Sequence, residues 1–293
     1  MIQSITFFKN PEDILLSHGK SNTIDSKNTY DDWHIIADSR PIFTPPKAKT
    51  TDIDVPGGNG SLDLSESLTR FPLYENRTGS FKFKVLNEWM EDGKPIYATN
   101  DKRKWAERYS DIMNFLHGKC FCAVLDDDPN WFYQGRFTVD AWDSGNTWSE
   151  ITIGYNVNPF KWSISSSVSD WLWDPFNFET GVLWSTICKN ILVNSDDTYK
   201  EILLPTYIKD AFSIEQFFGK VPISPTITFE PINELGGLDV RFTNDYLGID
   251  IEQRFQSGTT YAPDFLIYGQ PERYKFCLRG KGKVSIDFRV GRL

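Results

Sequence analysis

The feature that most constrains the fold of this chain is the stretch Pro45–Val85, which carries three structural signals in a fixed order. It begins with a β-prone run, Lys49–Val55, that a Pro-Gly-Gly sequence ends. A segment rich in Gly, Asp and Ser follows over Gly60–Leu68, typical of a turn or the entry to a short helix. Polar and apolar residues then alternate strictly over Gly79–Val85, which predicts a strand with one buried face. The stretch contains no nucleophile, base or metal-ligand cluster, so it predicts a shape.

Three segments of this stretch also carry a family resemblance. They read DVPGGNGSLDLSESLTR over residues 54–70, YENR over 74–77 and FKF over 81–83. Together they resemble the distal tail protein (Dit) family of long-tailed, siphophage-type phages and prophages. Its pattern is a DIPG-x-x-G-x-LDL-x-E-x-LTG-like run followed by a Y-x-NR element and an alternating strand. Val55 replaces the usual isoleucine, Arg70 stands where glycine is common, and GKGKVSIDFR over 280–289 with a final GRL is similar to the family's last strand and tail.

The resemblance implies a structural virion protein at the phage tail tip, assembled in the host cytoplasm. The N-terminal domain would form a six-fold ring, with a galectin-like C-terminal β-sandwich projecting outward. The ring would join the tail tube protein on one side to a tail-associated hub, lysin or receptor-binding protein on the other. DNA would pass through its lumen without specific binding. Extended edges would pair with the neighbouring subunit, and the candidate interface residues are Lys49, Thr51, Ile53, Val55, Phe81, Phe83 and Val85.

Composition independently favours a mainly β, β-rich α+β chain. With 293 residues, two domains are expected. The balance of 22 Phe, 12 Tyr and 10 Trp against 3 Met favours pleated sheets over helices. We place an N-terminal domain at residues 1–162 and a C-terminal domain at 163–293, with a serine-rich boundary over Ser163–Ser167.

Local periodicity predicts a helix over residues 101–117 that lies across a sheet. Its apolar stripe consists of Trp105, Tyr109, Ile112, Met113 and Leu116. Asn22–Tyr30 is predicted as a loop. In the N-terminal domain, strands are predicted over Ser4–Phe8, Asp32–Ala37, Cys120–Leu125, Trp131–Ala141 and Thr147–Val157, with Phe137, Val139 and Ala141 pointing inward. In the C-terminal domain, strands are predicted over Val182–Ile187, Ile191–Asn194, Thr226–Glu230, Leu238–Thr243, Gly248–Glu252, Asp264–Ile267, Tyr274–Leu278 and Val284–Val290, with a short helix within Asp210–Gly219.

Charge and cysteine usage narrow the possible partners. A net charge of −9 argues against wrapping around nucleic acid, which requires concentrated Lys and Arg. The four cysteines are expected to stay reduced, since so few do not make a disulfide framework in a chain of this length. We expect neither a signal peptide nor a membrane-spanning segment, because the N-terminus lacks a basic start and no apolar run is long enough.

No catalytic, cofactor or metal pattern stands out, and we predict that the protein is not an enzyme. The three histidines, His18, His34 and His117, are scattered singly. The run Asp126–Asp128 lacks calcium-loop spacing and is typical of a hairpin turn. The glycines at 57–60 and 280–282 match no phosphate-binding motif.

Two surface features leave alternatives open. The aromatic run containing Trp171 and Trp173 is typical of core or subunit-interface residues, but it also fits a carbohydrate contact. The alternative function is therefore a carbohydrate-binding module of a tail tip that contacts host cell-wall polysaccharide. The basic cluster Lys102–Lys104 fits either a protein interface or a solvated helix face. A tail-tube subunit is a third hypothesis, against which the second domain argues.

Overall fold

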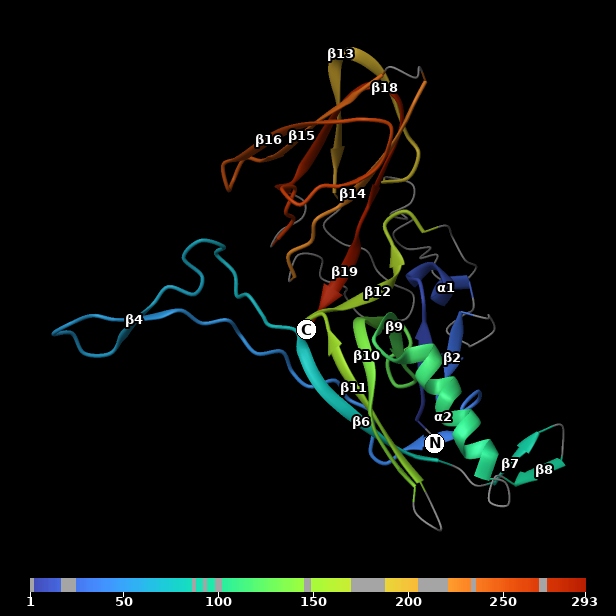
Figure 1. The fold of residues 1–293 in the computed structure, drawn as a ribbon. Helices are drawn as coiled ribbons and strands as arrows, with labels where there is room; N and C mark the ends of the chain where they lie inside the picture. The colour runs from blue at the N-terminus through green and yellow to red at the C-terminus, as the bar shows by residue number, and fades with distance from the viewer. Residues whose placement is uncertain are drawn as a thin grey trace, which may run out of the picture. The chain divides into compact units, whose positions relative to one another are not determined.

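The computed structural model describes residues 3–16, 25–85, 88–91, 94–97, 102–144, 149–169, 188–204, 221–232, 236–268 and 273–293. It is mainly β, as the composition predicted (Figure 1). The chain divides into two compact units, one comprising Met1–Ile164 with Leu293 and the other Ser165–Arg292.

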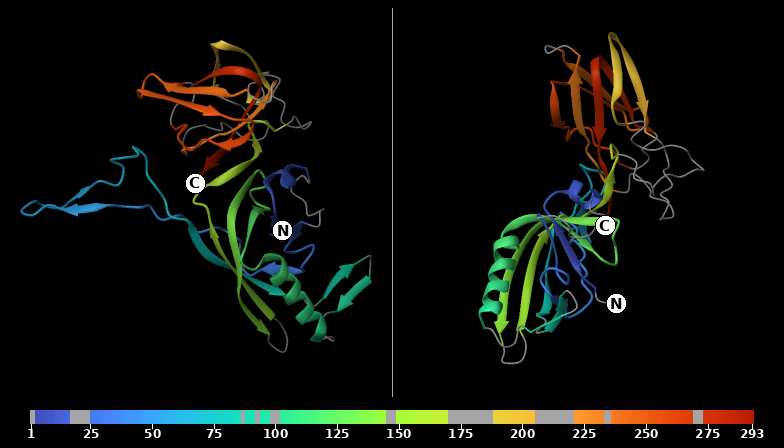
Figure 2. Two further views of the ribbon diagram at one scale, coloured as in Figure 1. Left: turned by 45° about the horizontal axis from the view of Figure 1, so that its top comes forward. Right: turned by 90° about the vertical axis from the view of Figure 1, so that its right-hand side faces the viewer.

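Unit 1 is built on a curved antiparallel sheet with the strand order β2-β1-β9-β10-β11-β6-β3 (Figures 1 and 2). β12 pairs with β10 beside this path. The strands are β1 (Ile5–Phe8), β2 (Ser26–Asn28), β3 (Ile35–Ala37), β6 (Arg77–Val85), β9 (Lys119–Leu125), β10 (Trp131–Ser144), β11 (Ser149–Val157) and β12 (Lys161–Ser166). The prediction of a loop over Asn22–Tyr30 is wrong at β2, whose residues pair with β1 despite their polar side chains.

Helix α2 (Lys102–Leu116) is the predicted helix, and it covers one face of this sheet (Figure 2). Ile112 and Leu116 of its apolar stripe are fully buried there, in one core with Phe7, Phe43 and Phe137. The helix α1 (Pro11–Leu16) and the hairpin of β7 (Glu88–Glu91) and β8 (Lys94–Tyr97) were not predicted.

One predicted inward residue, Ala141, points outward. The β10–β11 register shifts between Val139 and Ala141, so the strand carries an extra residue there. Such a bulge reverses the facing of the residues beyond it. Trp142 packs against the core instead of Ala141.

Unit 2 is a sheet organised around one long strand, β18 (Lys275–Asp287). β13 lies along one edge of β18, whereas β15 and then β14 share its other edge, and the change of partner falls between Arg279 and Gly282. β16 pairs with β15, β17 pairs with β14, and β13 pairs with β18 alone, so these three are the outer strands, while β19 is not part of this sheet. The remaining elements are β13 (Ile191–Leu203), β14 (Thr226–Pro231), β15 (Leu238–Asn244), β16 (Ile249–Phe255), β17 (Gly258–Tyr261) and β19 (Arg289–Arg292).

The strand predictions in unit 2 hold in part. Tyr274–Leu278 and Val284–Val290 were predicted separately, but β18 runs through the glycines between them and ends at Asp287. Asp264–Ile267 is not a strand and contributes only an isolated bridge between Ile267 and Ile223. The predictions for Val182–Ile187 and Asp210–Gly219 lie outside the described residues.

Replacing Gly282 with Ala is expected to destabilise unit 2 by about 1–3 kcal/mol, because the added methyl group overpacks a fixed site. A Cβ there would lie 2.6 Å from the Phe229 ring and closer still to the carbonyl oxygen of Glu230. The change in the free energy of unfolding is measured by chemical denaturation, from the transition that reports the unfolding of unit 2. The neighbouring Lys283→Ala variant alters an exposed side chain and is expected to stay within about 0.5 kcal/mol of wild type. Equal effects of both variants would contradict the packing argument.

Candidate assembly surface

The most distinctive surface of unit 1 is a long excursion of the chain between β3 and β6, residues Pro45–Asn76, which we call the arm. It extends far from the sheet in Figure 1 and in the left view of Figure 2. Its two legs are joined near the root, where the Lys49 N–H donates to Leu73 O and the Glu75 N–H donates to Lys47 O, each at 2.8 Å. Further out, β4 (Asp52–Asp54) pairs with β5 (Ser61–Asp63). No helix begins in Gly60–Leu68, where β5 and then turns occur.

The outer part of the arm, Thr51–Leu68, combines exposed apolar groups with negative charge, and we call it the arm tip. Ile53, Val55 and Leu62 are each about half exposed and Leu68 is 95% exposed. The tip also contains four carboxylates, namely Asp52, Asp54, Asp63 and Glu66, and no Lys or Arg. A two-stranded hairpin is marginally stable alone in water. Its exposed apolar side chains therefore indicate a surface that a partner covers.

The root of the arm is fixed to the sheet by a clamp of Thr44, Arg77 and Tyr155. The Arg77 guanidinium donates from Nε to the carbonyl oxygen of Pro159 at 2.7 Å and from Nη1 to that of Thr44 at 3.0 Å. Thr44 in turn donates its N–H to Tyr155 Oη at 3.0 Å and its Oγ1 hydroxyl to the carbonyl oxygen of Thr78 at 2.8 Å. The residues before and after the arm are thus tied together.

Arg77 is a buried cation, only 5% exposed. Its guanidinium lies 5.5 Å from the centre of the Tyr133 ring, and burial lowers its pKa. A buried charge is costly unless hydrogen bonds compensate it. The sequence contains a signal for this buried cation. Arg77 is separated by even numbers of residues from the inward residues Phe81, Phe83 and Val85, so strand alternation places it on the apolar face.

The candidate interface residues fall into two groups. Lys49, Thr51, Ile53 and Val55 are exposed on the arm. In contrast, the side chains of Phe81, Phe83 and Val85 are 6%, 0% and 4% exposed and belong to the core of unit 1. Alternation had predicted this buried face, and an inward side chain is not available to a neighbouring subunit. The interface proposed below therefore uses the backbone edge of β6.

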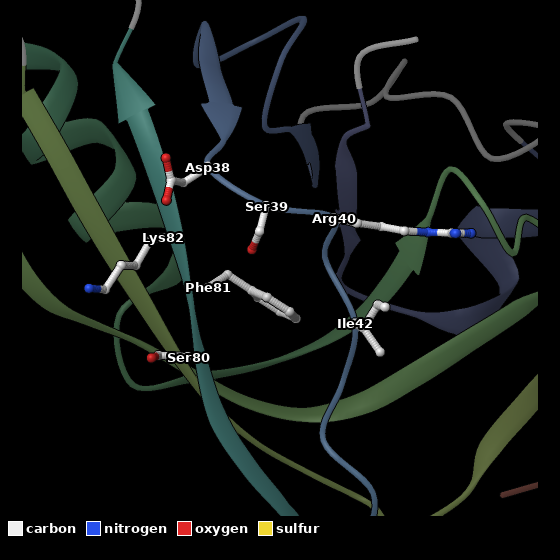
Figure 3. Close-up of a pocket in the computed structure, with 7 residues that line it drawn as sticks. All are labelled: Asp38, Ser39, Arg40, Ile42, Ser80, Phe81 and Lys82. Atoms are coloured by element: carbon white, nitrogen blue, oxygen red, sulfur yellow. The ribbon is translucent and has the colours of Figure 1, made fainter.

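A pocket of about 250 Å³ lies along that edge, and we call it the β6 slot. It is lined on one side by the segment after β3 and on the other by β6, with the Phe81 ring between them (Figure 3). The lining residues are Asp38, Ser39, Arg40, Ile42, Ser80, Phe81 and Lys82. The slot exists because the segment pairs with β6 at only two places. The Asp38 N–H donates to the carbonyl oxygen of Lys82 at 2.9 Å. The next hydrogen bond along the segment is the one from the Thr44 hydroxyl to the carbonyl oxygen of Thr78.

The charged side chains at the slot are paired with one another or with neighbours, except for one lysine. Lys84 forms a 2.6 Å ion pair with Asp38, which lowers the pKa of the Asp38 carboxyl and raises that of Lys84. Arg40 is 62% exposed and pairs with Asp127 at 2.6 Å. Lys82 is exposed and forms no ion pair with any described residue. Lys82 is therefore the cation at the slot that no ion pair with a described residue compensates.

The other features noted in the sequence have intramolecular roles where the structure describes them. Asp126 accepts hydrogen bonds from Ser4, and Asp128 pairs with Lys161, so the aspartate turn ties neighbouring strands together. No metal-binding cluster occurs among the described residues. Neither described helix combines the length and apolarity that crossing a membrane requires. Trp171 and Trp173 lie outside the described residues, as do the side chains of the basic cluster at residues 102–104, and both predictions about them stay open.

The solved structures similar to this chain include two phage tail proteins. The crystal structure of SPP1 Dit (gp 19.1), described as a paradigm of the hub adsorption apparatus in phages infecting Gram-positive bacteria, shares 11% identity at a TM-score of 0.49, with 100% of both chains covered. The phage P2 baseplate in its activated conformation with Ca shares 10% identity at a TM-score of 0.40, covering 100% of this chain and 99% of that chain. No family model and no curated protein matches the chain. The first structure bears the name of the family that the sequence motifs resemble, but at these values neither similarity carries the functional argument.

Proposed function

We propose that this protein is a structural component of a phage tail, a distal tail hub protein whose copies close into a six-membered ring. The observation that carries the proposal is the position of the family-like motifs. The run over residues 54–70 forms the arm tip, and the YENR element supplies Arg77, which holds the arm root. The residues that carry the resemblance are therefore the ones that build a projecting surface.

The arm is long enough to reach another copy. From Pro45 to Pro56 the outgoing leg has 12 residues. At about 3.3 Å per residue an extended leg spans at most about 40 Å. A compact unit of this size has a radius of gyration of about 15 Å. An arm anchored at the surface of one copy therefore spans much of the width of a neighbour.

Contact through the arm joins unlike surfaces, since the tip of one copy meets a different part of the next. Such heterologous contacts form a closed ring when the rotation between copies divides the circle. Covering the apolar side chains of the tip also supplies a driving force for association.

The remaining roles follow from the family resemblance. The ring would join the tail tube protein to a hub, lysin or receptor-binding protein, DNA would pass through its centre, and unit 2 would project as a galectin-like sandwich. The protein would assemble in the host cytoplasm and remain in the virion.

Light scattering coupled to size exclusion, with negative-stain images of the same peak, tests this proposal. A ring of six chains of 33.8 kDa has a mass of about 200 kDa and an open centre. A single 33.8 kDa species at every concentration would contradict a self-assembling ring.

A further inference from the structure

We infer that the arm tip of one copy docks in the β6 slot of a second copy, where β4 adds a strand to the open edge at Ser80. This inference rests on the proposed function and names the surface that receives the arm. Three independent features of the slot match the tip: its backbone edge, its charge and its apolar lining.

The backbone edge follows from the two bonds that bound the slot. The carbonyl oxygen of Lys82 accepts a hydrogen bond from Asp38, and that of Thr78 accepts one from Thr44. Both carbonyl groups therefore point away from β11. In a strand the N–H and C=O of alternate residues face the same side, so those of Ser80 face the slot as well. No hydrogen bond joins Ser80 to the facing segment Ser39–Phe43, both of which the structure describes. Ser80 thus leaves one N–H and one C=O unbonded between the two bonds that join the segment to β6, and an incoming backbone can hydrogen-bond to them.

Charge is complementary between the two surfaces. The arm tip carries carboxylates without any cation. Among the charged residues that line the slot, Arg40 pairs with Asp127 and Asp38 pairs with Lys84, whereas Lys82 has no ion-pair partner among the described residues. Opposite charges favour this pairing and oppose contact between two arm tips.

The apolar residues match by alternation. On β4, Asp52 and Asp54 point to one face, whereas Ile53 and, just beyond the strand, Val55 point to the other. On β6, Lys82 points outward and Phe81 inward. A strand added at this edge can thus place its carboxylates beside the lysines and its apolar residues beside Phe81 and Ile42, which is 64% exposed.

The occupant is a second copy and not the chain's own arm. The arm leaves the sheet at Thr44, at the end of the slot, and its tip lies far from β6 in Figure 1 and in the left view of Figure 2. The cross-bonds between its legs hold it in that extended form.

A charge reversal tests the docking. Lys82→Glu is expected to weaken self-association at least about tenfold, as measured by sedimentation equilibrium of the full chain. Asp54→Lys is expected to weaken it similarly, and the two together are expected to recover most of the affinity. Lys283→Glu makes the same charge change on an exposed lysine of unit 2 and is expected to leave association unchanged.

A second variant addresses the backbone edge. Ser80→Pro removes an N–H that faces the slot and no bond to β11, and is expected to weaken association while the melting temperature shows that unit 1 still folds. Assembly at wild-type affinity by both Lys82→Glu and Ser80→Pro would overturn the docking and leave the ring in place. A wild-type protein that never assembles would instead remove the proposed function itself.

Discussion

Removal of the hairpin at the end of the arm, residues 52–63, is expected to convert the assembling protein into a folded monomer. The deletion replaces residues 52–63 with a Gly-Ser-Gly-Ser linker, and its end points are set by the hydrogen bond from the Leu64 N–H to Thr51 O, which already brings the two legs together at 2.9 Å. All the deleted residues are exposed, so unit 1 loses no core contact. Covering Ile53, Val55 and Leu62 at about 1 kcal/mol or more each, together with the added-strand hydrogen bonds, corresponds to about a thousandfold in affinity.

Light scattering measures the mass, and thermal melting checks the fold. We expect a monomer whose melting temperature stays within about 2 °C of that of wild type. The milder Ile53→Ser, Val55→Ser double variant keeps the backbone of the hairpin and is expected to show an intermediate loss of about tenfold to a hundredfold. Wild-type assembly by the deletion variant would show that copies meet through another surface.

Replacing Arg77 with Met is expected to destabilise unit 1 by about 3 kcal/mol. Met has a similar length but donates no hydrogen bond, so the carbonyl oxygens of Thr44 and Pro159 lose their charged donor. Each lost bond of this kind costs about 1–3 kcal/mol, and relief from burying a cation offsets part of that loss. Because Thr44 and Arg77 bracket the arm, the variant is also expected to associate more weakly.

The unit 1 transition in a urea titration measures the loss of stability. Arg40→Met is the matched control, since Arg40 is 62% exposed and its ion pair with Asp127 is open to solvent. Exposed pairs contribute at most about 1 kcal/mol, so this variant is expected to stay close to wild type. Equal destabilisation by the two variants would contradict the role given to the clamp.

The sequence predicted those parts of the fold that local periodicity determines. The stripe of α2 and the alternation in β6, β10 and β11 depend on residues close together in the chain, and these elements were placed well. Ala141 was misplaced because a bulge depends on how two strands pair, which no single-strand pattern contains. β18 was divided because glycines are typical of turns, whereas here Gly282 permits a close approach of β14.

The assembly surface was only half predictable. The β-prone run Lys49–Val55 correctly indicated an extended segment, and its exposure on the arm fits a contact with another copy. Phe81–Val85 was assigned to the same interface because the sequence indicates that this segment is a strand, but does not show whether its side chains or its backbone edge would make the contact. The slot beside Ser80 depends on where β3 ends relative to β6, which is a tertiary property.

A cryo-electron microscopy reconstruction of the assembled particle tests the central claim most directly. We expect a ring in which the arm of each copy crosses to its neighbour and β4 lies along the neighbour's β6 edge at Ser80. Arms that project freely, or that cover another surface while the β6 slot stays open, would contradict it.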